Sequence, residues 1–297
     1  MSGEENFSAE LARLNAQEFT TRTERFERVT RVVGLTVEAT GIAAEIGAQC
    51  VIETNNGGTA IEAEVVGFDG KHLYLMPIHY LEGIRAGSLV RFKQAQSLCG
   101  VGEKMLGRVI NGLGEPIDGK GPIAYDAEVA LDAKAINPME RGEVKDVLDT
   151  GIKAINGCLT FGKGQRMGLI AGSGVGKSVL MGMLTRNTAA DVVVIGLIGE
   201  RGREVQEFVQ KTLGEAGLAR AVVIAAPVDV SPVMRIKAAK LTHSVAEYFA
   251  AKGNDVLLLF DSLTRVAHAQ REIGLAVGEP PTTKGYTPSV FSLLPKL

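Results

Sequence analysis

The 297-residue sequence is 45% apolar and 22% charged, which is typical of a globular protein with one large or two moderate hydrophobic cores. Its 32 Lys and Arg residues against 34 Asp and Glu residues give a net charge of -2, so the charge balance favours neither nucleic acid nor anionic lipid as a partner. Three widely spaced cysteines, Cys50, Cys99 and Cys158, fit neither a disulfide framework nor a metal site and indicate a reducing cytoplasm.

The first 28 residues are charged and compatible with a helix. Apolar side chains recur there at roughly helical intervals, at Phe7, Leu11, Leu14, Phe19 and Phe26. We expect residues 1–28 to form an amphipathic arm that binds a partner; a frayed tail is the alternative, because a short helix is marginal in water unless it docks. This stretch lacks the apolar core of a secretory signal, and no apolar run in the sequence approaches the ~20 residues of a membrane span. Any membrane association is expected to be peripheral.

Residues 29–97 carry the alternation and the turn signals of short strands. Apolar side chains alternate with glutamates over residues 61–65, and Asn-Gly and Asp-Gly pairs separate short apolar runs. This pattern predicts a small antiparallel barrel or sandwich, and we find no residues in it that carry chemistry. Residues 107–121 are rich in Gly, Pro, Asn and Asp and predict a turn-rich connection, so we place the domain boundary ahead of them, after residue 97.

From Arg166 onward, buried strand-like runs alternate with helical patterns. The predicted strands are 167–170, 192–198, 222–225 and 256–260. A helix is predicted to begin at Ser231, whose hydroxyl caps it ahead of a first-turn proline, and to end near Gly253. This rhythm predicts an α/β fold for residues 98–297, with a parallel sheet covered on both faces and functional sites at the carboxyl ends of its strands.

A glycine-rich run is predicted to join the first of these strands to a helix, which is the setting of a phosphate-binding loop. It reads Ala171, Gly172, Ser173, Gly174, Val175, Gly176, Lys177 and Ser178, and the predicted binding site extends to Val179. The glycines let backbone N–H groups turn toward phosphate oxygens, Lys177 reaches the outer phosphates, and the Ser178 hydroxyl can ligate magnesium. Ala171 stands where the strict pattern has glycine. A chance glycine-rich turn is the alternative, which the flanking strand and helix disfavour.

Two acidic residues follow other predicted strands. Asp261 ends the strand 256–260 and is expected at the same sheet edge as the phosphate loop, where it holds magnesium through water. Glu200 lies in the run 199–204, which contains two acids and two bases. A carboxylate near a terminal phosphate can polarise the attacking water, while arginines orient it or balance the charge on the phosphoryl oxygens. We predict that Glu200 is catalytic; a cluster of surface ion pairs at a helix start is the alternative.

Six motifs, taken in order, resemble type III secretion ATPases, which are relatives of the rotary ATP synthase β subunit. They are Asp149–Asn156, Gly164–Arg166, the phosphate loop, Gly199–Glu204, Asp261–Arg265 and Gly278–Pro281. The resemblance covers roughly residues 29–297. Within that family, Ala225–Pro232 and Ala154–Asn156 are more similar to the flagellar export branch than to the injectisome branch.

The resemblance implies a RecA-like P-loop ATPase core behind a small β-barrel, which hydrolyses ATP with Mg²⁺ to energise flagellar protein export. It implies that Lys177, Glu200 and Arg201 are catalytic, with Arg201 on the γ-phosphate side, and that Ser178 and Asp261 serve the metal. It also implies a homohexamer, a stator-like regulator on the N-terminal arm, a stalk-like protein in the pore, and export chaperones, substrates and gate. The expected location is the cytoplasm, at the periphery of the inner membrane, and nucleic acid is not an expected partner.

Members of the family continue beyond position 297 with an arginine finger, so the resemblance implies a truncated chain that lacks it. Because such a finger contributes about 10³ to 10⁵ in rate, the chain is expected to bind nucleotide better than it hydrolyses it. A non-catalytic nucleotide-binding or assembly module and an injectisome-type ATPase remain as alternatives. The flagellar-type motifs disfavour a synthase β subunit, and the near-neutral charge disfavours an RNA-translocating relative.

Overall fold

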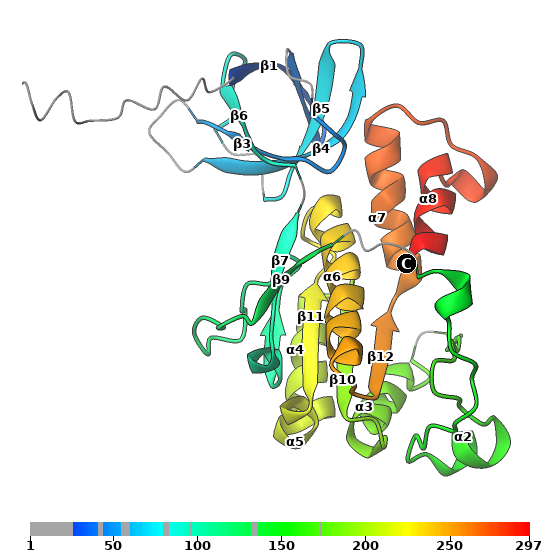
Figure 1. The fold of residues 1–297 in the computed structure, drawn as a ribbon. Coiled ribbons are helices and arrows are strands. Elements are labelled where there is room, and N and C mark those ends of the chain that lie inside the picture. The colour runs from blue at the N-terminus through cyan, green and yellow to red at the C-terminus, as the bar shows by residue number, and fades with distance from the viewer. Residues whose placement is uncertain are drawn as a thin grey trace, which may run out of the picture.

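The computed structural model describes residues 26–40, 44–54, 60–79, 83–95, 97–131, 136–172 and 174–297. Figure 1 shows a β-barrel seated on a larger α/β domain. Residues 1–25 of the expected arm lie outside the described residues. The assignment of residues 26–28 to that arm is wrong, because they begin strand β1, in which Glu27 and Val29 are buried and Phe26 and Arg28 are exposed. That alternation has the period of a strand rather than of a helix.

Six antiparallel strands close into the barrel in the order β1-β2-β5-β4-β3-β6. They are β1 (Phe26–Val33), β2 (Thr36–Thr40), β3 (Gln49–Ile52), β4 (Ile61–Asp69), β5 (His72–Pro77) and β6 (Leu89–Gln94). The alternation predicted over residues 61–65 is confirmed in β4, where Ala63 and Val65 are fully buried. Closure decides between the two predicted architectures in favour of the barrel.

A four-stranded parallel sheet, in the order β12-β10-β11-β8, forms the centre of the larger domain. Its strands are β8 (Arg108–Ile110), β10 (Val192–Ile198), β11 (Ala221–Ala226) and β12 (Val256–Asp261). The three strands predicted at 192–198, 222–225 and 256–260 are confirmed. Strand β8 lies inside the stretch predicted to be a turn-rich connection, so that prediction was incomplete. A second small sheet pairs β7 (Leu98–Val101) with β9 (Ala127–Ala130).

Helices cover both faces of the parallel sheet, as predicted (Figure 1). Helices α6 (Pro232–Ala251) and α7 (Leu263–Ala276) lie on one face, and α8 (Pro288–Leu293) contacts α7. On the other face lie α3 (Lys177–Asn187), α4 (Gly202–Glu207), the π-helical segment η3 (Phe208–Leu213) and α5 (Gly214–Ala219). A short helix, α2 (Lys153–Cys158), lies ahead of the glycine-rich run, and four 3-10 turns complete the described elements: η1 (Glu103–Met105), η2 (Pro138–Glu140), η4 (Thr283–Gly285) and η5 (Leu294–Lys296).

The strand predicted at 167–170 is wrong. This segment lies within the described range 136–172, and it forms no strand there. Leu169 and Ile170 are 46% and 98% exposed, although the apolar run suggested a buried strand. A strand requires a neighbour to pair with, and hydrophobicity alone does not supply one. Strand β12 therefore stands at the edge of the sheet, hydrogen-bonded to β10 alone among the described strands.

None of the described helices is both long enough and apolar enough to cross a membrane.

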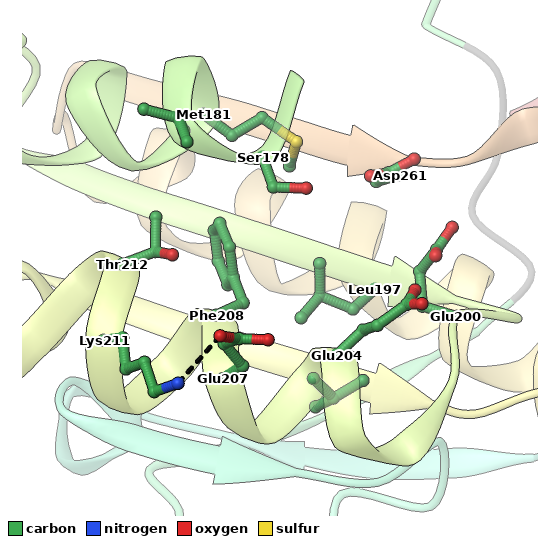
Figure 2. Close-up of a pocket in the computed structure, with 12 residues that line it drawn as sticks. Ser178, Met181, Leu197, Glu200, Glu204, Glu207, Phe208, Lys211, Thr212 and Asp261 are labelled. Carbon is green, nitrogen blue, oxygen red and sulfur yellow. Dashed lines mark hydrogen bonds and ion pairs between the residues drawn. The ribbon is translucent and has the colours of Figure 1, made fainter. Parts of the chain in front are cut away.

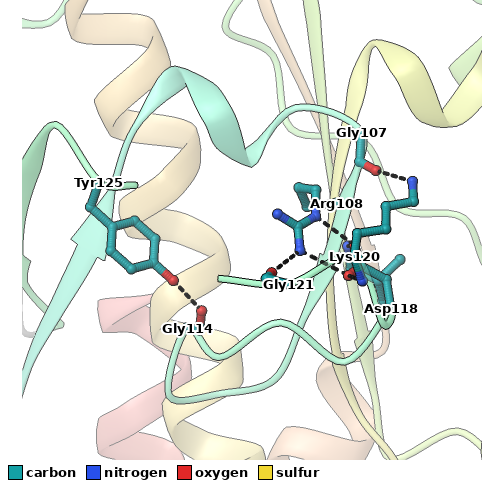
Figure 3. Close-up of polar contacts among 8 residues, drawn as sticks. Gly107, Arg108, Gly114, Asp118, Lys120, Gly121 and Tyr125 are labelled. Atoms are coloured by element: carbon teal, nitrogen blue, oxygen red, sulfur yellow. Dashed lines mark hydrogen bonds and ion pairs between the residues drawn. The ribbon is translucent and has the colours of Figure 1, made fainter. Parts of the chain in front are cut away.

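At the other edge of the sheet, an ion pair of low solvent exposure joins β8 to the loop that follows it (Figure 3). Arg108 donates two hydrogen bonds to Asp118, from Nε at 2.7 Å and from Nη2 at 2.9 Å. Backbone N–H groups of Val109 and Lys120 donate to the same carboxylate at 3.1 and 3.0 Å. The hydrogen bond from the Arg108 guanidinium is the main reason why the pKa of Asp118 lies far below its ordinary value.

We expect Asp118→Asn to lower the free energy of unfolding by about 3 kcal/mol, because the amide turns a donor toward the guanidinium and leaves it without its counter-charge. The depressed pKa of Asp118 adds stability that is fully present above the ordinary aspartate pKa and is lost as pH falls through the folded value. The difference from wild type should therefore be largest near neutral pH and shrink in acid. Urea unfolding at several pH values measures it, with Glu143→Gln as control, because Glu143 pairs with Lys145 while 78% exposed. Equal losses in the two variants would contradict a special role for the buried pair.

Candidate active site

The glycine-rich run forms a loop that turns directly into α3. Helix α3 begins at Lys177 and is preceded by Gly176, whose φ is 96°, and Gly174 has a φ of 78°. Both angles lie in the left-handed region that glycine adopts without strain. Apart from the adjacent residues in the chain, no atom of the described residues lies within 4 Å of the position that a Cβ would take at Gly172, Gly174 or Gly176. The loop glycines therefore border open space ahead of the helix N-terminus, where backbone N–H groups bind anions. Ser173 lies outside the described residues.

The other predicted loop residues lie at the surface. Ala171 is exposed, and the side chains of Val175 and Val179 are exposed as well, at 68% and 58%. All three side chains face solvent. Ser178, one residue into α3, turns toward the sheet (Figure 2).

Lys177 and Asp261 meet at the carboxyl edge of the sheet. Lys177 Nζ lies 2.5 Å from Asp261 Oδ1, although 84 positions separate the two residues in sequence. The Asp261 side chain is 7% exposed, and the Lys177 side chain is 32% exposed. The end of β12 and the start of α3 thus place a buried carboxylate beside the loop lysine.

A cavity of about 330 Å³ lies beside this pair, between α3 and the α4–η3 segment (Figure 2). Apolar side chains and carboxylates both line it. It is lined by Ser178, Val179, Met181, Leu197, Glu200, Glu204, Val205, Glu207, Phe208, Lys211, Thr212 and Asp261. Four predicted site residues, Ser178, Val179, Glu200 and Asp261, therefore share one cavity.

Glu200 is half-buried at the rim of this cavity, two residues after β10 ends. Burial raises its pKa, and the carboxylate of Asp261 and a hydrogen bond with Glu204 raise it further, against the opposing charges of Lys177 and Arg265. A carboxylate with a raised pKa is a stronger base than an ordinary glutamate. The geometry thus provides a proton acceptor beside the loop.

A tight glycine turn places Glu200 there. Gly199 has a φ of 75°, and a Cβ on it would lie 2.7 Å from the Cβ of Arg265. The chain therefore reverses against the first turns of α7. Sequence reasoning did not assign a role to Arg265, although the residue stands in the Asp261–Arg265 motif. Its charge acts on Glu200, and only the packing of α7 against the Gly199 turn reveals this.

Arg201 lies at the outer rim and not in the lining of the cavity. Its side chain is 67% exposed, and its Nη1 lies 3.3 Å from Glu204 Oε1. In this arrangement Arg201 orients Glu204, which in turn shares a hydrogen bond with Glu200.

The donor set fits a nucleotide with a hard metal ion. The loop offers backbone N–H groups and the Lys177 ammonium to phosphate, and Ser178 and Asp261 offer oxygen atoms of the kind that Mg²⁺ prefers. Among the described residues, no cluster of three His, Cys, Asp or Glu side chains could hold a metal ion by itself. A magnesium ion here would therefore take most of its ligands from water and phosphate, which is its usual habit.

Comparison with known proteins matches this architecture. The family model for the nucleotide-binding domain of the ATP synthase alpha/beta family matches residues 151–297, and that for its beta-barrel domain matches residues 29–94. The flagellum-specific ATP synthase of Pseudomonas aeruginosa is 54% identical over 91% of this chain, and that of Salmonella typhimurium is 51% identical over 99%. The chain spans 60% and 65% of the lengths of these two relatives.

A solved structure shows the same fold. It is the assembled ATPase EscN, in complex with its central stalk EscO, from the type III secretion system of enteropathogenic E. coli. It superimposes with a TM-score of 0.83 at 38% identity, over 91% of this chain and 66% of that one. On the two matching domains, their order and these identities, the chain belongs to the ATP synthase alpha/beta family.

Proposed function

We propose that the chain binds ATP with Mg²⁺ at the phosphate loop and hydrolyses it to energise protein export through a flagellar or type III apparatus. The observation that carries the proposal is the meeting of Lys177, Asp261 and Glu200 at one sheet edge, beside an open glycine loop. The names of the relatives support the link to protein export, because they are called flagellum-specific ATP synthases and a type 3 secretion system ATPase.

Each residue has a role in this proposal. The loop N–H groups and Lys177 hold the phosphates, so the lysine exchanges Asp261 for a phosphate oxygen. Ser178 and Asp261 would hold Mg²⁺, with Asp261 acting through water, and the bound metal would supply positive charge against the phosphate oxygens. Glu200 accepts a proton from the attacking water as the bond between the γ-phosphorus and the bridging oxygen breaks, which releases ADP and phosphate. Arg201 and Arg265 supply positive charge at the γ-phosphate side.

Partners and location are also proposals. EscN was solved as an assembled ATPase with a central stalk, which supports a ring of identical subunits around a stalk-like protein here. We propose further contacts with a stator-like regulator, an export gate, chaperones and substrates, on the cytoplasmic side and at the periphery of the inner membrane. The near-neutral net charge of the chain gives no reason to propose a nucleic-acid partner.

Titration of the purified chain with ATP tests the proposal. We expect binding in the presence of Mg²⁺, weaker binding when EDTA removes the metal, and phosphate release during incubation. Binding that EDTA leaves unchanged would contradict the roles of Ser178 and Asp261. A chain that binds Mg-ATP without releasing phosphate would act as a nucleotide-binding module instead of an enzyme.

A further inference from the structure

The barrel contacts the α/β domain at the N-terminal end of α6 (Figure 1). Ser231 caps α6 by accepting a hydrogen bond from Met234 N at 3.2 Å. The same hydroxyl donates a hydrogen bond of 2.8 Å to the backbone oxygen of Ile78, just after β5. Met76 and Ile78 are 1% exposed and belong to the same hydrophobic core as the buried face of α6. The end of β5 is therefore built into the core of the α/β domain.

A buried ion pair makes a second contact about two turns further along α6. Lys237 Nζ lies 2.5 Å from Glu64 Oε2 of β4, and the two side chains are 3% and 18% exposed. The ammonium also donates to Ser97 Oγ, which in turn accepts a hydrogen bond of 3.0 Å from Gln49 on β3. Separating a buried ion pair leaves an uncompensated charge and is strongly destabilising. We therefore expect this contact to fix the position of the barrel relative to α6. We call Ser231, Lys237, Ile78, Glu64 and Ser97 the α6 joint.

Three residues before Ser231, the chain contacts the backbone of Glu200. Val228 N donates a hydrogen bond of 2.9 Å to the backbone oxygen of Glu200, and Gly199 N donates one of 2.7 Å to Ala226. The short segment 227–231 thus connects the Glu200 turn to the cap of α6. A displacement of the barrel must either break the joint or carry the N-terminus of α6, and with it this segment, along.

We propose that α6 couples the barrel to the active site, with Ser231 and Lys237 as positioning residues that set the Glu200 turn. The proposal rests on the function proposed above for the role of Glu200. The coupling itself depends only on the contacts of the joint, so it can be measured without any turnover.

Hydrogen exchange of single amides tests the coupling directly. In Lys237→Met, we expect the amides of Val228 and Gly199 to exchange on the order of tenfold faster than in wild type, because their anchoring segment is loosened. The amide of Leu258, in the middle of β12, should keep its wild-type rate. Lys237→Arg, which preserves the charge opposite Glu64, should restore slow exchange at Val228.

The matched control is Lys252→Met at the opposite end of α6. Lys252 pairs with Glu103 at 2.9 Å, and Glu103 lies outside the six strands of the barrel. Should Lys237→Met not fold, Glu64→Gln weakens the same pair from the barrel side, and the same readout applies. Unchanged exchange at Val228 in the folded joint variants, or an equal increase in Lys252→Met, would overturn the proposal.

Turnover provides the second readout. Loosening the Glu200 turn should lower kcat in Lys237→Met while the affinity for Mg-ATP stays at the wild-type value, because no hydrogen bond or ion pair links the described residues of the phosphate loop to the joint. A fall in affinity with kcat unchanged would contradict a positioning role. If the wild-type chain shows no turnover at all, the proposed function fails, and the exchange rates still decide whether the joint couples the two domains.

Discussion

Glu200→Gln is expected to bind Mg-ATP with wild-type affinity and to hydrolyse it about 10²- to 10⁴-fold more slowly, the usual contribution of a positioned proton acceptor. Glutamine keeps the size of the side chain, but its neutral amide cannot accept the proton of the attacking water. Phosphate release measured beside a binding titration separates the two effects. The control is Glu207→Gln, which changes a carboxylate on the same cavity rim whose side chain is 61% exposed and pairs with Lys211. Comparable losses in both variants would show that the charge of the rim matters and not Glu200 itself.

The same variant should be more stable than wild type at neutral pH. The pKa of Glu200 is raised, first by burial and next by Asp261, so the folded protein holds this proton more tightly than the unfolded chain. The favourable contribution is fully present below the ordinary glutamate pKa and is lost as pH rises through the raised value. Glutamine is neutral at every pH and avoids the cost of the buried charge. We therefore expect a higher Tm at pH 7 to 8 and a difference that vanishes near pH 4.

A gain in stability with a loss of turnover is the expected sign of a site kept under strain for function. Glu200 is half-buried beside a second carboxylate, an arrangement that folding alone does not favour. A variant that lost both turnover and stability would instead indicate a structural role.

The sequence predicted the parts of the fold that follow from local pattern. Strand β10 was predicted with its observed ends, because all seven of its residues are apolar and buried between helices on both faces. Asp261 does lie beside the phosphate loop, as predicted from the end of strand β12, although the strand predicted to lead into that loop at 167–170 is not formed. Periodicity could not predict which strands pair with each other. Strand β8 has only three residues in a turn-rich stretch, and it exists because β11 pairs with it.

The opposite error arose at residues 167–170, where apolar side chains suggested a strand for which the structure provides no partner. The electrostatic neighbours of Glu200 were predicted only in part, because the sequence indicated Asp261 and Lys177 at the same edge but not Arg265 or the hydrogen bond with Glu204. The action of Arg265 depends on α7 packing against the Gly199 turn, and that of Glu204 depends on the first turn of α4. The first contact joins two separate motifs, and the second depends on how the run 199–204 enters its helix, and the sequence pattern does not show either.

Lys177→Ala is expected to weaken Mg-ATP binding by about 10- to 150-fold, because a hydrogen bond to a charged group contributes about 1.5 to 3 kcal/mol. The control is Lys163→Ala, which removes a lysine whose Nζ lies 2.5 Å from Asp255, away from the loop, with both side chains more than 40% exposed. Unchanged affinity in Lys177→Ala, or an equal loss in Lys163→Ala, would show that Lys177 does not bind the phosphates as proposed.

Lys177→Ala should also lower the free energy of unfolding, because it leaves the carboxylate of Asp261 buried without its partner. An unsatisfied buried acceptor costs about 1 to 3 kcal/mol. A loss of binding could then be mistaken for a loss of folding. Addition of Asp261→Asn resolves this, since the neutral amide needs no counter-charge and the double variant should regain most of the lost stability.

The double variant therefore makes the decisive comparison. It should unfold close to wild type and still fail to bind Mg-ATP, because neither the phosphate ligand nor the metal carboxylate is present. Recovery of binding together with stability would mean that Lys177 only neutralises Asp261. Stability without binding would indicate that Lys177 contacts the nucleotide directly. The ion pair between Lys177 and Asp261 would then be the arrangement of the nucleotide-free site, which a phosphate replaces when it binds.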